Sequence, residues 1–194
     1  MSLRLFAGIA FVLAASAASS QPMHHPAAHA GAGHAAQIRE ALTAAPPAIA
    51  AHARVVDMEG HVLREGNNGF TCMPTPVGVP AGAHSPMCVD EVWLGAMQAY
   101  MHHDTSFRPQ RVGIAYMLAG DTGASNVNPF DEHRTATNHW VEEGPHLMMI
   151  EPDPARLQGL STDENNGGPY VMWANTPFAH VMIPVGPRHM AAHH

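Results

Sequence analysis

The chain has 194 residues, nine basic residues that are all arginine, sixteen acidic residues and a formal net charge of −7 at pH 7. The lack of lysine excludes Schiff-base chemistry and a P-loop lysine. The negative charge does not suit nucleic acid or an anionic membrane surface, which both require clustered positive charge, so we expect no nucleic-acid partner.

The first twenty residues are typical of a cleaved secretory signal peptide. Arg4 precedes an apolar stretch from Leu5 to Ala15, and small residues continue to Ser20. The stretch is shorter than the roughly 20 apolar residues that span a bilayer, and no later segment is long enough. We predict that residues 1–20 are removed and that the mature chain, without a membrane span, is periplasmic or secreted.

The remaining chain is predicted to form one globular domain, residues 36–186, between two histidine-rich ends. Residues 21–35 carry four histidines among small residues and are expected to form a flexible arm. Residues 187–194 are expected to form a histidine-rich tail. Both ends would bind divalent metal weakly, whatever the domain does.

Two helices are expected in the domain. The first covers residues 36–45 and stops at Pro46-Pro47. The second starts at Val89 and reaches Met101, with apolar residues at helical spacing and acidic residues at its beginning. One further helical turn is expected at residues 153–157, where Pro154 suits the first helical position.

Strands are expected between these helices and after them. Two hairpins are predicted because each pair of apolar runs flanks a short connection, and a turn is expected at residues 67–69, before residues 70–72. The expected strands cover residues 54–57, 61–65, 112–118, 147–150, 170–173 and 179–185. The sequence therefore predicts an α+β fold, with an antiparallel sheet of about five to six strands and one main helix on one face.

Cys72 and Cys88 are the only cysteines, and in an exported chain an even pair most simply forms one disulfide. The segment between them is rich in proline and glycine, and closing a loop of this size would contribute about 3 kcal/mol. A redox or metal-binding thiol pair is the alternative, although it would favour C-x-x-C spacing.

Asp121-Thr122-Gly123-Ala124-Ser125 follows an apolar run and resembles the active-site turn of aspartic proteases. The resemblance implies a catalytic carboxyl at Asp121, which would share a proton with a second such turn. Gly120 stands where that family has an apolar residue, and no second copy occurs, so the dyad would require a dimer. The alternative is a turn that caps its own backbone.

Ser125 is a second catalytic candidate, with His146 or His180 as its base. The chain has no G-x-S-x-G elbow, which is the local signature of one large class of serine hydrolases. Asp121 with His146 as a partner base is the remaining hydrolase hypothesis.

Two predicted strands contain the spacing His-x-Met, at His146 and Met148 and at His180 and Met182. Strand side chains alternate, so the histidine and methionine of each pair share a face, and four N and S donors would converge if the strands were neighbours. Imidazole with thioether suits copper, particularly Cu(I). The alternative is a methionine core with hydrogen-bonded histidines at its edge.

Four segments together resemble a group of secreted bacterial proteins without an assigned activity: residues 68–74, 120–126, 144–148 and 177–182. The resemblance implies a single exported domain and no particular chemistry. Our leading hypothesis is an exported copper-binding protein with a metal ion as its partner. The alternatives are a hydrolase that uses Asp121 and a ligand-binding or structural module whose cleft is lined by Trp140, Tyr170 and Trp173.

Overall fold

The structure is a computed structural model that describes residues 27–80 and 82–188. The predicted signal peptide, the first part of the predicted arm and residues 189–194 of the predicted tail lie outside these ranges. Among the described residues, no helix combines the length and the apolar character that crossing a bilayer requires.

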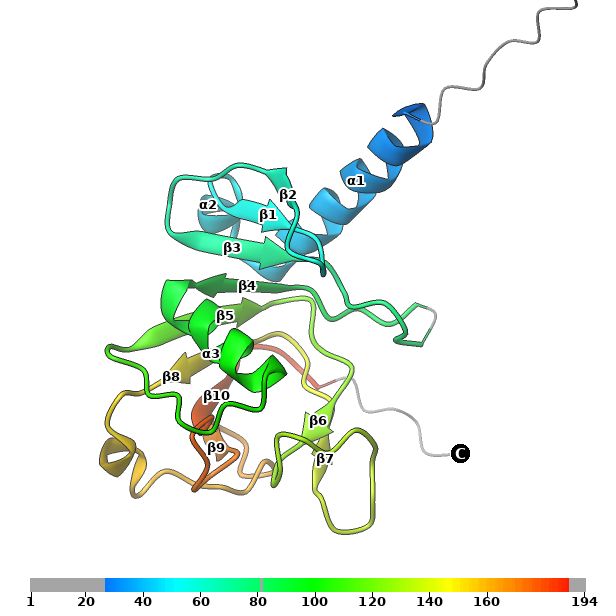
Figure 1. The fold of residues 1–194 in the computed structure, drawn as a ribbon. Coiled ribbons are helices and arrows are strands. Elements are labelled where there is room, and N and C mark those ends of the chain that lie inside the picture. Colours follow the sequence, from blue (N-terminus) through cyan, green and yellow to red (C-terminus); the bar gives the residue numbers. More distant parts are fainter. Residues whose placement is uncertain (1–26, 81, 189–194) are drawn as a thin grey trace, which may run out of the picture.

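A sheet of eight strands forms the centre of the molecule, in the order β2-β1-β3-β4-β5-β8-β10-β9 (Figure 1). Its strands are β1 (Arg54–Val56), β2 (Val62–Arg64), β3 (Phe70–Met73), β4 (Met87–Asp90), β5 (Gly113–Met117), β8 (His146–Ile150), β9 (Tyr170–Met172) and β10 (His180–Pro184). The α+β class is confirmed, and so are the two hairpins, β1 with β2 and β9 with β10.

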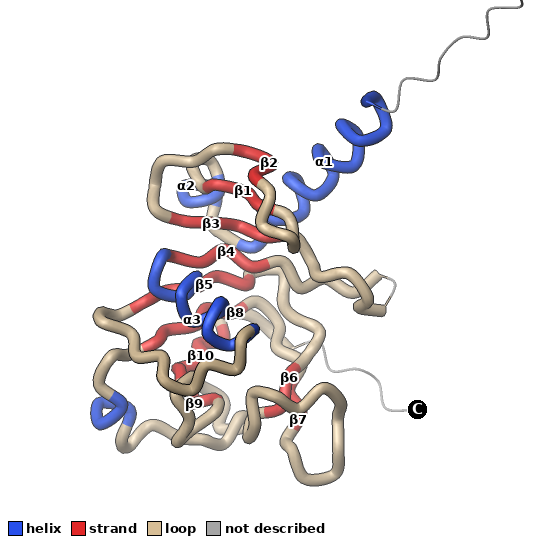
Figure 2. Tube along the Cα trace, in the orientation of Figure 1, coloured by secondary structure: helices blue, strands red, loops and turns tan. Residues whose placement is uncertain are grey.

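The sheet is larger than the five to six strands that we predicted, and it is not purely antiparallel, because β1 pairs with β3 in parallel. The prediction missed β3, before which it placed only a turn, and β4, whose apolar residues directly precede a helix and continue its apolar pattern. Two further short strands, β6 (Ala124–Ser125) and β7 (Trp140–Val141), form a separate pair beside the main sheet (Figure 2).

The predicted disulfide between Cys72 and Cys88 is present. The two cysteines lie directly opposite each other on β3 and β4, with both side chains buried. Cross-strand neighbours on one face are close enough for a bridge without a long connection. The disulfide therefore fixes the pairing of two central strands.

The main helix, α3 (Glu91–Met101), covers one face of the sheet (Figures 1 and 2). It begins at Glu91 rather than Val89, because Asp90 caps it by accepting the Trp93 N–H at 2.9 Å. The other oxygen of Asp90 accepts the Ile114 N–H at 2.7 Å and so ties the helix start to β5. One N-cap thus sets where the strand ends and how the helix lies on the sheet.

The N-terminal helices pack on the opposite face, against β1, β3 and β4. They are α1 (Ala27–Ala41), a 3-10 turn η1 (Leu42–Ala44) and α2 (Pro47–Ala50). The first helix begins at Ala27 rather than Ala36, so part of the segment that we expected to be a flexible arm is helical. Alanine is the strongest helix former and accounts for this extension.

Alternation along β5 and β8 divides the core between the two faces of the sheet. The residues His146, Met148 and Ile150 of β8 are buried on the α3 face, where Met182 of β10 and Tyr170 of β9 join them. Residues of the opposite face form a separate apolar cluster with Leu157 of η2 (Pro154–Leu157), the helical turn that was predicted after Asp153. The candidate site lies on the α3 face.

Candidate functional site

His146 and His180 begin two neighbouring strands and are held in the same way. The ring Nδ1 of His146 lies 2.8 Å from the Gly144 carbonyl oxygen, and that of His180 lies 2.9 Å from the Phe178 carbonyl oxygen. A carbonyl oxygen can only accept, so Nδ1 carries the hydrogen and Nε2 presents its lone pair. Both rings are buried, and within residues 27–80 and 82–188 neither Nε2 has a hydrogen-bond partner.

Burial lowers the pKa of His180 to about 4 and also lowers the pKa of His146. Both rings are therefore neutral at pH 7. A neutral imidazole whose Nδ1–H is fixed by a backbone carbonyl is the form in which histidine binds a metal ion or accepts a hydrogen bond.

The strand register separates the two imidazoles. All four predicted ligands are on one face, and Met148 lies directly opposite Met182. However, Pro184 lies opposite His146 and Ile150 lies opposite His180, so the histidines are four residues apart along the strands (146 to 150). At about 3.3 Å per residue this is roughly 13 Å. The structure therefore does not bring the two imidazoles into one site.

His180 faces a cavity of about 190 Å³ between α3 and the sheet. The lining side chains are almost entirely apolar and include three methionines and four aromatic residues: Met87, Met97, Met148, Trp93, Tyr100, Trp173 and Phe178. The rings of Trp93 and Trp173 each form a T-shaped contact with the His180 ring, with centroid distances of 5.1 and 4.9 Å. An apolar cavity with one neutral imidazole is a typical binding site for a small ligand or a soft metal ion.

Hydrogen bonds to backbone carbonyl groups hold two of the aromatic side chains that line this cavity. Trp173 has a φ of 55°, which is unusual for a bulky side chain, and its Nε1–H donates to the Ser125 carbonyl oxygen at 2.7 Å. Tyr100 stacks on Trp173 and donates to the Pro129 carbonyl oxygen at 3.0 Å. Backbone strain of this kind persists only where surrounding contacts hold it, as it does at many binding sites.

A larger groove of about 520 Å³ lies elsewhere, beside η2 and the turn between β9 and β10. Its walls are mainly proline, glycine and polar loop residues. Of the buried side-chain atoms that lack a hydrogen-bond partner in the described part of the chain, none belongs to a residue that lines this groove. The smaller cavity beside His180 is therefore the better candidate.

His146 faces Asp121 instead. Oδ1 of Asp121 accepts the N–H groups of Gly123 at 3.0 Å and of Glu143 at 2.8 Å, and its Oδ2 lies 3.9 Å from His146 Nε2. Burial raises the pKa of Asp121 to about 7, against the opposing effect of the two N–H donors. The turn that resembles an aspartic protease thus faces a histidine of its own chain.

Glu143 is buried next to this pair and was not predicted as a site residue. Its Oε1 accepts the Tyr170 hydroxyl at 3.0 Å and two N–H groups of Arg188, at 2.9 and 2.6 Å. Burial raises the pKa of Tyr170, while the hydrogen bond with Glu143 raises that of Arg188. The sequence offered one signal for this partner of Glu143, because Arg188 is the one arginine in the predicted histidine-rich tail. It lies beyond the predicted end of the domain at residue 186.

The other predicted site residues have structural roles. The buried Ser125 hydroxyl donates to the Asn138 carbonyl oxygen and accepts the N–H groups of Val127 and Asn128, so it holds its own turn. Trp140 packs against Gly123, where an added Cβ would lie 2.2 Å from the Trp140 Nε1. Of the three aromatic residues expected to line a cleft, only Trp173 lines the cavity beside His180.

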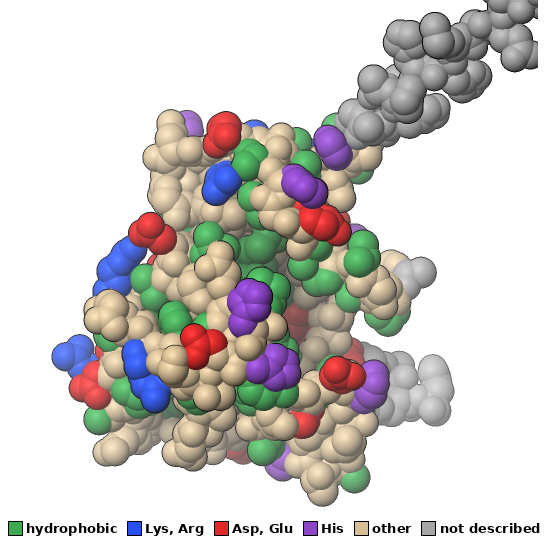
Figure 3. Space-filling model, viewed as in Figure 1, with side chains coloured by type: hydrophobic (Ala, Val, Ile, Leu, Met, Phe, Trp, Pro, Cys, Tyr) green, Lys and Arg blue, Asp and Glu red, His purple; other side chains and the backbone are tan. Residues whose placement is uncertain are grey.

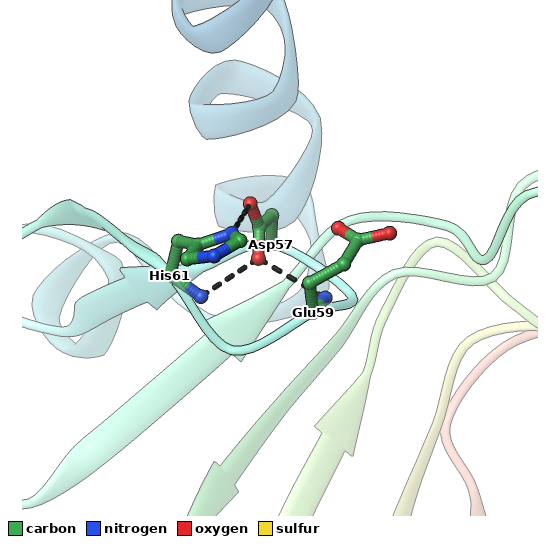
Figure 4. A group of neighbouring side chains, drawn as sticks. All are labelled: Asp57, Glu59 and His61. Atoms are coloured by element: carbon green, nitrogen blue, oxygen red, sulfur yellow. Dashed lines mark hydrogen bonds and ion pairs between the residues drawn. The ribbon is translucent and has the colours of Figure 1, made fainter.

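The exposed loop between β1 and β2 brings Asp57, Glu59 and His61 together (Figure 4). Among the described residues, this is the one group in which three His, Cys, Asp or Glu side chains place ligand atoms within 4.8 Å of one another. Oδ1 of Asp57 accepts the N–H groups of Glu59 and His61, and its Oδ2 lies 2.9 Å from His61 Nδ1. These hydrogen bonds explain why the three side chains lie together: Asp57 stabilises the turn of its own loop.

The surface carries no continuous positive region on the face shown in Figure 3, where arginine side chains lie beside acidic ones. The chain matches no model of a known protein family, no curated protein and no solved structure. The two buried histidines and their surroundings are therefore the features from which a function is inferred.

Proposed function

We propose that this is an exported copper-binding protein that holds Cu(I) in the cavity beside His180. The observation that carries the proposal is the His180 Nε2, a buried nitrogen without a hydrogen-bond partner in the described part of the chain, in a cavity that three methionines also line. Thioether and imidazole are the ligands that Cu(I) prefers, and the tautomer of His180 already directs a lone pair away from the backbone.

The proposal keeps His180 and Met148 from the predicted ligand set and replaces the other two residues. Met87 and Met97 line the cavity, whereas His146 and Met182 do not. The tryptophan rings next to His180 would add a cation–π contact to a bound monovalent ion, because the ring face attracts a desolvated cation. The low charge of Cu(I) also suits a cavity without a carboxylate.

Copper binding is tested by competition against a Cu(I) chelator under anaerobic reducing conditions. Replacing His180 by Gln removes the nitrogen donor, and we expect it to weaken binding at least 100-fold. His146→Gln is the matched control, since His146 has the same backbone hydrogen bond and the same burial but lies outside the cavity. The histidine-rich ends are identical in both variants, so their contribution cancels.

The methionines allow a second matched pair. Met148→Leu keeps most of the volume of a cavity residue and removes its sulfur, and we expect about 10-fold weaker binding. Met182→Leu makes the same change at the residue directly opposite, outside the cavity, and should leave the affinity unchanged. Equal affinities of the His180→Gln and His146→Gln proteins would contradict the copper proposal.

A small apolar organic ligand is the second candidate for the same cavity. The volume of about 190 Å³ exceeds what a single ion requires. Trp93 Nε1 is also buried and has no hydrogen-bond partner among the described residues, so it would donate to such a ligand while His180 Nε2 accepts from it. This candidate predicts that a small alcohol or phenol raises the thermal stability of the copper-free protein, and that Trp93→Phe reduces the shift.

Export is part of the proposal. The disulfide between Cys72 and Cys88 suits an oxidising compartment, and the first twenty residues have the pattern of a signal peptide. N-terminal sequencing of protein recovered from the periplasm or medium tests it, with a mature terminus expected close to Gln21. Recovery of the full-length chain in the cytosol would contradict export.

A further inference from the structure

We propose a second active centre, separate from the copper cavity, in which Asp121 and His146 hold a water molecule between them and Asp121 acts as a general base on a small carboxylic ester. This centre uses buried groups that the copper proposal leaves without a role. It does not depend on copper, so each proposal can fail without the other.

The geometry of the pair is set by hydrogen bonds to the atoms that do not face each other. Two backbone N–H groups hold Oδ1 of Asp121, and the Gly144 carbonyl oxygen holds Nδ1 of His146. The remaining acceptor atoms of the two side chains, Oδ2 of Asp121 and Nε2 of His146, face each other at 3.9 Å. Groups oriented in this way are preorganised to bind a third group.

The distance of 3.9 Å is too long for a direct hydrogen bond and fits one water molecule bonded to both atoms. Such a water would donate one hydrogen to Nε2 and the other to Oδ2, which fixes the direction of its oxygen lone pairs. The Asp121 side chain keeps 15 % of its surface exposed, so the pair lies immediately below the surface and not in the deep core.

The reaction balances with water as the only co-reactant. The water oxygen forms a bond to the acyl carbon as its proton passes to Asp121 Oδ2. The tetrahedral adduct then breaks its bond to the leaving oxygen, and Asp121 returns the proton to that oxygen. The products are a carboxylic acid and an alcohol, and the Asp121 carboxylate is restored. His146 is a positioning residue for the water in this scheme.

The hydrogen bonds that nearby backbone N–H groups already make limit the class of substrate that this centre would hydrolyse. Those of Gly123 and Glu143 are already bonded to Asp121, so they are not free to stabilise an oxyanion. Esters with good leaving groups depend least on such stabilisation. Peptide bonds, with a poor leaving group, are correspondingly disfavoured.

The charged surroundings support a base that works near neutral pH. Burial raises the pKa of Asp121, Glu143 and Glu142 add to this effect, and Arg188 compensates the charge of Glu143. A general base is most effective when its pKa lies near the working pH.

The test measures hydrolysis of 4-nitrophenyl acetate and 4-nitrophenyl butyrate at pH 8 by the full chain without copper. Asp121→Asn keeps an Oδ1 that accepts the same two N–H groups and removes the base, so we expect the rate to fall about 100-fold. Asp57→Asn is the matched control. It changes an aspartate that also accepts two N–H groups and faces a histidine, but on the exposed loop of Figure 4, and it should leave the rate unchanged.

Surface histidines also hydrolyse activated esters slowly, and they contribute equally to both variants. His146→Gln provides a second variant in which Asp121 is retained, and we expect a rate about 10-fold below that of the wild type. If the wild type, Asp121→Asn and His146→Gln proteins, each shown to be folded by circular dichroism, hydrolyse both esters at the same rate, the proposal is overturned.

Discussion

The surroundings of His146 and His180 differ sharply, although both residues begin paired strands and form the same backbone hydrogen bond. His180 lies among tryptophan, methionine and phenylalanine side chains, whereas His146 lies beside a carboxyl group and near an ion pair. The first environment suits a soft cation or an apolar ligand, and the second suits proton transfer. The comparison shows that neighbours from other elements, and not the local sequence, give each imidazole its chemistry.

Buried charge also distinguishes the two regions. Glu143 and Arg188 form an ion pair next to His146, with Glu143 almost fully buried, and none of the described residues that line the cavity beside His180 is acidic. The His146 region therefore depends on charge compensation and the His180 region on apolar packing. Three substitutions test this difference.

Of the three substitutions, the removal of Arg188 should lower the stability of the protein most. Arg188→Met leaves the buried carboxylate of Glu143 without its cation, and we expect a loss of about 3–5 kcal/mol in the free energy of unfolding. Chemical denaturation monitored by circular dichroism measures it. The double variant Glu143→Gln with Arg188→Met should recover much of the loss. A double variant no more stable than Arg188→Met would show that packing and not charge dominates.

Asp121 should make the protein less stable as the pH rises. Its pKa is about 7 in the folded chain and 3.8 in a free side chain, so the unfolded chain loses this proton first. The stability that it contributes is present below about pH 4 and is lost as the pH rises to about 7, by roughly 4 kcal/mol. Asp121→Asn should therefore be more stable than the wild type at pH 8 and similar to it at pH 4. Denaturation curves at both values decide the sign.

His180 should have the opposite effect on acidification. Its pKa is about 4 in the folded chain and 6.5 in a free side chain, so its contribution to stability is present above about pH 6.5 and is lost as the pH falls. Between pH 7 and pH 5 the loss is about 2 kcal/mol. His180→Gln should remove this part of the pH dependence, which thermal unfolding across the range measures. An unchanged slope in His180→Gln would place the acid sensitivity elsewhere, with His146 as the next residue to replace.

Local patterns in the sequence predicted much of the fold. The helix ending at Met101, both hairpins, the helical turn after Asp153 and the disulfide all follow from apolar spacing, turn residues and cysteine count. The boundary between β4 and α3 did not, because three apolar strand residues are followed almost directly by an apolar helix and only the Asp90 cap separates them. The parallel pairing of β1 with β3 joins segments whose contact no local pattern encodes.

Strand periodicity, which can be read from the residues alone, fixes which side chains share a face, and it places His146 with Met148 and His180 with Met182. Which of these side chains meet depends on how the strands pair in the folded chain. Register depends on how two strands pair over their whole length, and here it places the histidines at opposite ends while it brings the methionines together. The partners of each imidazole come from α3 and from loops distant in the chain, whose positions follow from packing and not from any short stretch of sequence.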